Sequence, residues 1–81
     1  MKLILYGHPR CSLCDRLEQA IDPWMAANRA TLIKRDITTN TCWYQRYRHR
    51  IPVLVFNDRE ILEGRPEAVE IEQAMGRIAP G

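Results

Sequence analysis

The sequence has no long hydrophobic run, no internal repeat and no low-complexity segment. Because a membrane-spanning helix needs roughly 20 apolar residues, we expect no membrane segment. At 81 residues and without a linker-like stretch, the chain predicts a single domain over residues 1–81 and excludes large multi-domain machinery. The apolar run that follows Lys2 is too short for a secretory signal, so we expect a cytoplasmic protein.

A large excess of either charge is also missing. The 12 Lys and Arg residues against 10 Asp and Glu residues give a net charge of +2, which is too small to indicate nucleic-acid binding. The charges are nevertheless unevenly placed, since Arg46, Arg48, His49 and Arg50 fall within five residues. Such a cluster is either a solvated face or a surface that attracts an anionic substrate or partner.

The chain has only three cysteines, which in a cytosolic protein do not indicate a structural disulfide framework. Structural zinc sites use four ligands, usually from two cysteine pairs, and here one pair, Cys11 and Cys14, is accompanied by a distant Cys42. A site that adds His8 to these three is conceivable, but the spacing matches no recognisable zinc pattern. We therefore expect no metal site and favour redox chemistry for the pair.

Two strand-like runs flank a helical pattern in the first half of the chain. Residues 1–6 are typical of a strand covered on both faces, and residues 31–37 are a second strand candidate. Between them, apolar residues recur at helical spacing from Ser12 onward and predict the face of a helix that lies on the sheet, at Leu13, Leu17, Ala20, Ile21 and Trp24. Pro23 predicts a kink or a restart of that helix near Ile21. Strand, helix and strand in this order predict a βαβ unit with parallel strands.

The second half of the chain predicts, in order, a short helix, two strands and a final helix. Capping residues, an apolar run, a two-residue turn and a proline mark these elements. Capping residues 38–40 precede a short helix that ends near Arg48, and the apolar run 51–56 is a strand. Asn57 and Asp58 form the turn before a second strand at residues 59–62, and Pro66 lies in the first turn of the last helix. The predicted order of the whole chain is βαβαββα.

The Cys-x-x-Cys pair lies where the first strand gives way to the first helix. Cys11 precedes the helix proper, so its sulfur can face solvent and the unpaired amides of the helix N-terminus, which stabilise a thiolate. Arg10 adds positive charge beside it. Cys14 lies one turn further along and points back beneath Cys11. These positions predict Cys11 as the attacking thiolate and Cys14 as the resolving thiol of thiol–disulfide exchange.

Ile51 and Pro52 open the third predicted strand. A proline at the first residue of a strand is common, because no backbone donor is needed there. Alternatively, the peptide bond before Pro52 is cis and turns the backbone of Ile51 toward the thiols. The residues alone favour neither interpretation.

Two segments carry a family resemblance. They are Gly7-His8-Pro9-Arg10-Cys11-Ser12-Leu13-Cys14-Asp15 and, much later, Arg50-Ile51-Pro52-Val53-Leu54. Together with the order of elements, they resemble the glutaredoxin-like family of the thioredoxin superfamily. The resemblance implies an α/β, thioredoxin-like fold, with a four-stranded mixed sheet flanked by three helices. It also implies that Cys11 is the nucleophile, that Cys14 resolves, and that the bond before Pro52 is cis.

The same resemblance implies a small thiol–disulfide oxidoreductase that reduces protein or glutathione-mixed disulfides. We expect a monomer without a bound cofactor, with glutathione as a candidate co-substrate. Glutaredoxins hold glutathione with a pair of glycines near the last helix, whereas this chain has a single one, Gly64. The candidate substrate contacts are Arg10 and Arg50, whose guanidinium groups suit carboxylates, together with Pro52 and the backbone of Ile51.

Two other functions stay open. A binding module would use the aromatic and arginine-rich residues 43–50 with inactive thiols, and a metal carrier would share an iron–sulfur cluster between two chains. We expect Cys42 to pack as a small hydrophobe on the second helix rather than to act as a regulatory thiol. We also expect Trp43 to pack internally, whereas Tyr44 and Tyr47 either pack or form an exposed patch.

Overall fold

The computed structural model describes residues 1–78, and its order of elements confirms the predicted βαβαββα arrangement. The elements are β1 (Lys2–Gly7), α1 (Ser12–Ala27), β2 (Thr31–Asp36), the 3-10 helix η1 (Ile37–Thr39), α2 (Thr41–Tyr47), β3 (Val53–Phe56), β4 (Arg59–Glu63) and α3 (Ala68–Ile78). Among the described residues, no helix is long and apolar enough to cross a membrane.

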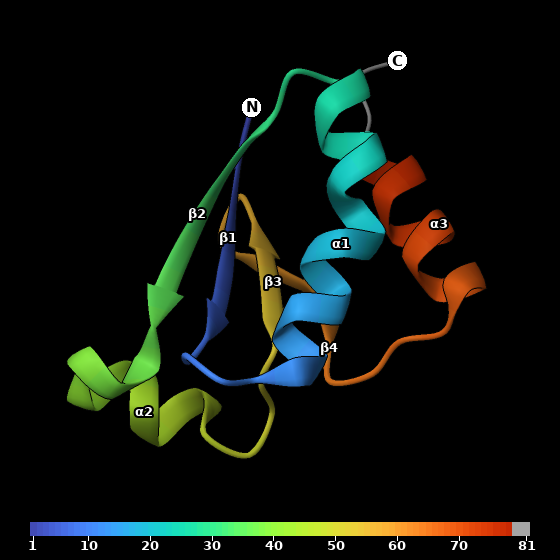
Figure 1. The fold of residues 1–81 in the computed structure, drawn as a ribbon. Helices are drawn as coiled ribbons and strands as arrows, with labels where there is room; N and C mark the ends of the chain where they lie inside the picture. Colours follow the sequence, from blue (N-terminus) through green and yellow to red (C-terminus); the bar gives the residue numbers. More distant parts are fainter. Residues whose placement is uncertain (79–81) are drawn as a thin grey trace.

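The strands form one mixed sheet in the order β2-β1-β3-β4. β1 pairs in parallel with β2, as expected for a βαβ unit, while β3 runs antiparallel to both β1 and β4. Figure 1 shows α1 and α3 side by side, with the N-terminus of α1, the end of β1 and the helix α2 gathered at one edge of the sheet. That edge holds the candidate site.

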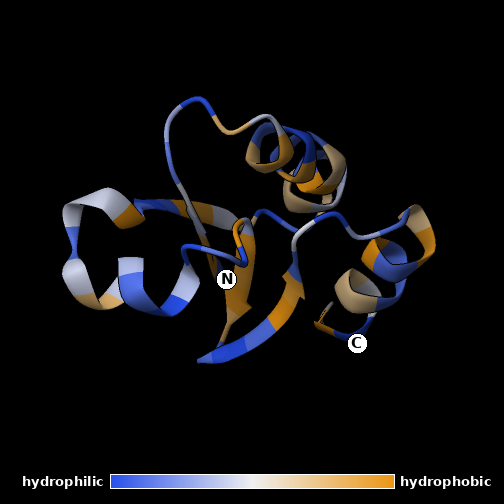
Figure 2. Cartoon of the chain, turned by 90° about the horizontal axis from the view of Figure 1, so that it is seen from below, coloured by the Kyte–Doolittle hydropathy of each residue, from blue (hydrophilic) through white to orange (hydrophobic). Residues whose placement is uncertain are grey.

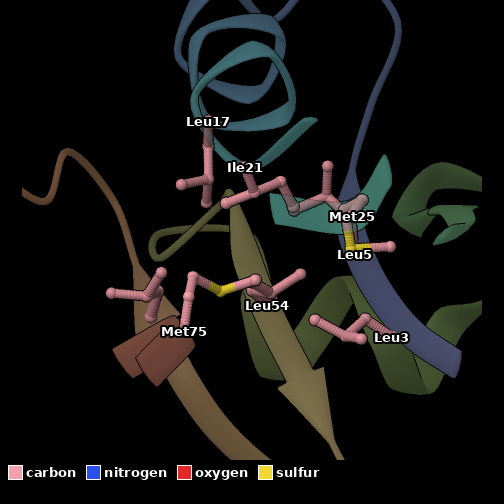
Figure 3. Close-up of a cluster of buried hydrophobic side chains, with 8 residues drawn as sticks. Leu3, Leu5, Leu17, Ile21, Met25, Leu54 and Met75 are labelled. Carbon is pink, nitrogen blue, oxygen red and sulfur yellow. The ribbon is translucent and has the colours of Figure 1, made fainter. Parts of the chain in front are cut away.

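One face of the sheet is buried under α1 and α3. Because successive side chains of a strand point to opposite faces, Leu3 and Leu5 of β1 share this face with Leu54 of β3. Figure 3 shows them meeting side chains from both helices. The cluster consists of Leu3, Leu5, Leu17, Ile21, Met25, Leu54, Leu62 and Met75. It presses α1 against the sheet along the length of the helix.

The other face of the sheet is covered by η1 and α2. Its cluster consists of Tyr6, Ile37, Tyr47, Val53 and Val55. The ring of Tyr6 stacks on Tyr47 at 4.3 Å between centroids and forms a T-shaped pair with Trp43 at 5.7 Å. The internal packing predicted for Trp43 is therefore confirmed, and Tyr47 packs in the same way. Tyr44 is 44% exposed.

The buried face of α1 differs from the expected one. Ala20, which was expected to face the core, is exposed, and Met25 is buried. Since Met25 lies beyond Pro23 and packs in the core, it holds the last turn in place. The helix therefore continues to Ala27 and does not restart near Ile21.

Two further expectations are wrong. Pro66 lies before α3 rather than in its first turn, because the backbone C=O of Glu67 accepts from the N–H of Ile71 at 3.0 Å and makes Glu67 the residue that precedes the helix. Cys42 is exposed and does not pack as a small hydrophobe. The inward face of the short helix α2 is occupied by Trp43 and Tyr47, which leaves Cys42 on the solvent side.

The β3–β4 hairpin closes through Asn57 and Asp58, as predicted. Their φ angles are 50° and 63°. A two-residue loop with both φ angles positive is the type I′ turn, whose twist matches that of the flanking strands. Asn and Asp tolerate this left-handed region better than other non-glycine residues, which explains how the turn forms without glycine.

We predict that Asp58→Gly raises the melting temperature by about 2–4 °C, corresponding to about 0.5 kcal/mol, because glycine adopts a positive φ without steric cost. Asp58→Ala is the matched comparison and is expected to lower the melting temperature, since it places a Cβ in the same strained region without the local hydrogen bonding of Asp. Thermal unfolding followed by circular dichroism measures both. Equal melting temperatures for the two variants would contradict the strain argument.

Candidate active site

Cys11 and Cys14 form a disulfide at the N-terminus of α1, with their Cα atoms 5.2 Å apart. Cys11 is the N-cap residue of the helix, with extended φ and ψ angles of −102° and 103°. The backbone N–H of Cys14 donates to Sγ of Cys11 at 3.1 Å, and the N–H of Asp15 donates to the C=O of Cys11, also at 3.1 Å. The sulfur of Cys11 thus takes the place that a side-chain oxygen has in an ordinary N-cap.

The two cysteines differ in access to solvent. Cys11 is half-buried, whereas Cys14 is only 7% exposed and belongs to the buried face of α1. The backbone N–H at the Cys11 sulfur and the positive end of the helix dipole both favour the thiolate form once the disulfide is reduced. The structure therefore brings the pair together as expected, with Cys11 outside and Cys14 beneath it.

Gly7, the last residue of β1, lies directly against the inner cysteine. A Cβ added at Gly7 would be 2.7 Å from Sγ of Cys14 and 3.3 Å from its Cβ. The first of these distances is too short for any real contact, so a larger residue here would displace Cys14. Sequence inspection missed this role, although the glycine that ends the first strand four residues before Cys11 was visible.

The loop before β3 lies at the same edge of the sheet. The peptide bond between Ile51 and Pro52 is cis. Tyr6 pairs with Val53 in the antiparallel register, so one step further along the strands brings Pro52 beside Gly7 and therefore beside the cysteine pair. The C=O of Pro52 accepts from the N–H of Gly64 at 2.8 Å, which anchors the loop to the residue after β4.

The two arginines predicted to contact substrate are placed differently. Arg10 is exposed, immediately precedes Cys11 and has a positive φ of 65°. Arg50 is half-buried and bonded to carboxylates of its own chain: its guanidinium donates to Glu60 and, through Nε at 3.0 Å, to Glu63. These bonds, the one to Glu60 first, raise the pKa of Arg50 above its ordinary value. A substrate carboxylate at Arg50 would have to compete with both glutamates.

A cavity of about 310 Å³ opens beside Cys14, between α1 and the end of β2. Its polar lining comes from both elements and includes an ion pair of 2.9 Å between Lys34 and Glu18. Asp36, at the carboxyl end of β2, also lines it. Sequence reasoning did not single out these residues as neighbours of the thiols, because the parallel register of β1 and β2 is what brings them there. Within residues 1–78, no group of three or more His, Cys, Asp or Glu side chains is arranged to hold a metal ion.

The fold is thioredoxin-like. A mutant thioredoxin from Halobacterium salinarum superposes with a TM-score of 0.64 at 19% identity, covering 98% of this chain and 74% of that one. Thioredoxin 1 from Thermosipho africanus gives 0.64 at 17% identity, covering 95% and 92%. Trichomonas vaginalis thioredoxin gives 0.61 at 21% identity, covering 94% and 77%. At these identities the likeness establishes the thioredoxin-like fold alone.

The family is given by the sequence itself. Residues 2–76 match the glutaredoxin-like domain family (DUF836). Because this match spans almost the whole chain, the protein belongs to the glutaredoxin-like family, and the resemblance seen in the sequence is confirmed. With a cysteine pair at the helix N-terminus, it has the arrangement used for thiol–disulfide redox chemistry.

We predict that Gly7→Ala lowers the free energy of unfolding of the oxidised protein by about 1–3 kcal/mol, the usual cost of overpacking. The added methyl group must push Cys14 away from β1. Gly76→Ala is the matched control, since nothing lies within 4 Å of a Cβ there and alanine favours helix α3. It should be neutral or stabilising. Urea denaturation of both variants tests this, and a Gly7→Ala protein as stable as the wild type would show that Cys14 moves at no cost.

The carboxyl group of Asp36, at the end of β2, contributes to the pH dependence of stability. The side-chain hydroxyl and the backbone N–H of Thr38 both donate to Asp36, at 2.6 and 2.9 Å, and lower the pKa of that carboxyl below 3.8. A lowered folded-state pKa stabilises the fold above pH 3.8, and this contribution is lost as the pH falls through the lowered value.

We therefore predict that Asp36→Asn is less stable than the wild type at neutral pH, and that the difference shrinks with acidification. The amide cannot be protonated in this range, so only the wild type loses the contribution. Urea midpoints measured from neutral pH downward test this, with the exposed Asp22→Asn as the control. A wild-type advantage that stays constant down to the lowest pH would contradict the assignment.

Proposed function

We propose that this protein is a small thiol–disulfide oxidoreductase that reduces protein or glutathione-mixed disulfides, with Cys11 as nucleophile and Cys14 as resolving cysteine. The observation that carries the proposal is the asymmetry of the pair. Cys11 caps the helix with its sulfur and is half-buried, while Cys14 is buried beneath it and within disulfide reach.

The exchange has two steps. In the first, the thiolate of Cys11 attacks one sulfur of the substrate disulfide, a bond forms between them, and the other substrate sulfur leaves as a thiolate. In the second, the deprotonated thiol of Cys14 attacks Sγ of Cys11, closes the Cys11–Cys14 disulfide and releases the second substrate thiolate. Two electrons pass from the protein to the substrate, and an external thiol, for which glutathione is the candidate, must reduce the pair again.

Each step has structural support. The first needs Cys11 ionised near neutral pH, and the N–H of Cys14 at 3.1 Å together with the helix dipole favours the thiolate. The second needs Cys14 close to Cys11, and the contact with Gly7 leaves the inner sulfur little room to turn away. In the proposal, the loop around Ile51 and Pro52 lines the substrate side of the pair.

The direct test is cysteine replacement. Cys11→Ser is expected to reduce turnover of a disulfide substrate to the uncatalysed rate, because serine supplies no thiolate. Cys14→Ser, assayed without glutathione, is expected to stop after one attack and to accumulate a mixed disulfide on Cys11. Cys42→Ser, which changes an exposed thiol on α2, should keep full activity and serves as the control.

Intact-protein mass spectrometry and turnover assays check these outcomes. A Cys11→Ser protein that reduces disulfides at the wild-type rate would rule out the mechanism. If glutathione is the co-substrate, adding it to the trapped Cys14→Ser adduct should release the substrate and leave glutathione on Cys11. An adduct that glutathione does not release would remove glutathione from the proposal.

A further inference from the structure

We propose that the exposed basic and aromatic surface of α2 and the following loop binds an acidic segment of the protein whose disulfide the cysteine pair reduces. We call it the α2 surface and define it by Tyr44, Arg46, Arg48 and His49, all of them exposed. The inference rests on the proposed function and adds to it the chemical class of the substrate.

The charge of this surface is not compensated by its surroundings. The sequence contains no Asp or Glu between Asp36 and Asp58. Among residues 1–78, the ion pairs within 4 Å involve Lys34 and Arg50 and leave out Arg46 and Arg48. Arg50 is satisfied by two glutamates of β4, whereas the guanidinium groups of Arg46 and Arg48 remain available for carboxylates from outside.

Aromatic rings hold these two guanidinium groups in place. The guanidinium of Arg46 lies 5.8 Å from the ring centre of Tyr47, and that of Arg48 lies 5.8 Å from the ring centre of Tyr44. A cation over a ring is partly ordered without losing its charge or its outer N–H donors. The side chains are therefore oriented for bidentate bonds to carboxylates at a reduced entropic cost.

The α2 surface is continuous with the thiol site. The C=O of Tyr47 accepts from the N–H groups of Arg50 and Ile51, at 2.8 and 3.1 Å, and so ties the end of α2 to the residue before Pro52. Figure 1 shows α2 and this loop at the edge where α1 begins. In Figure 2, which looks from below, the segment that holds α2 is mostly blue and white.

Charge complementarity favours an acidic protein segment over the alternatives. A nucleic acid is bound through a series of phosphate contacts, whereas this surface offers two open guanidinium groups on a chain whose net charge is +2. A segment that carries two or more carboxylates next to the disulfide matches the pair of arginines next to the thiols. A second copy of this chain, docked through its own glutamates, is an outcome that the test separates.

The test compares symmetric disulfide-linked peptides in single-turnover reactions with the reduced protein in excess. One peptide carries Glu on both sides of its cysteine and the other carries Gln at the same positions. Rates are normalised to the reduction of each peptide by dithiothreitol, which removes differences in intrinsic reactivity. We expect the Glu peptide to react about tenfold faster at low ionic strength, with the ratio falling toward one at high salt.

Two double variants locate the effect. Arg46→Gln with Arg48→Gln is expected to bring the Glu to Gln rate ratio close to one. Arg29→Gln with Arg77→Gln removes the same charge after α1 and in the last turn of α3, at the opposite edge in Figure 1, and should keep the tenfold ratio. A ratio near one in the wild type, or an equal loss of preference in both double variants, would overturn the proposal.

Two more measurements separate the remaining explanations. Fluorescence anisotropy of Ser-for-Cys versions of both peptides tests the surface without any thiol chemistry: preferential binding of the Glu peptide supports the inference even if the cysteines prove inactive. Sedimentation velocity measures self-association of the protein. Suppose that the wild type forms oligomers, that the Arg46→Gln, Arg48→Gln variant is monomeric, and that the wild type shows no preference between the peptides. This result would assign the α2 surface to contacts with a second copy of the chain and overturn the proposal.

Discussion

The first turn of α1 lies so close to β1 that the strand has no room for a side chain at Gly7. This contact sets the position of the Cys14 sulfur and, through the disulfide, that of Cys11 at the helix N-terminus. Further along, buried Leu17 and Ile21 press the helix onto the sheet. The positions of the two sulfurs therefore depend on a packing constraint that lies outside the Cys-x-x-Cys motif, at Gly7, where only a residue without a side chain fits.

Much of the fold follows from local patterns. The apolar runs and turn residues predicted the order of elements, and the βαβ rule predicted the parallel pairing of β1 with β2. The placement of Cys11 at the helix N-terminus was also predictable, because it needs only the boundary between a strand and a helix. The cis bond before Pro52 came from the family resemblance, since the residues alone favoured neither isomer.

What the sequence did not reveal depends on residues that meet only in the folded chain. Arg50 was expected to bind a substrate carboxylate, but the β3–β4 hairpin places Glu60 and Glu63 within hydrogen-bond distance of its guanidinium group. The cavity beside Cys14 forms because the chain returns after α1 and β2 pairs in parallel with β1, which places the end of β2 next to α1. Cys42 is exposed because the stacking of Tyr47 on Tyr6 turns the opposite face of the short helix α2 toward solvent.

The pairing of β1 with β3 joins the two halves of the chain. β1 and α1 supply Gly7 and the two cysteines. α2, β3 and the loop between them supply the cis-proline bond and the arginines that lie over tyrosine rings. The two halves meet where β1 pairs with β3, through the register of Tyr6 with Val53 and of Leu5 with Leu54. Neither half contains the complete candidate site. The arrangement around the cysteine pair is consequently a property of long-range assembly, and a fragment carrying the motif alone would keep its thiols but lose the strand and the loop that pack beside them.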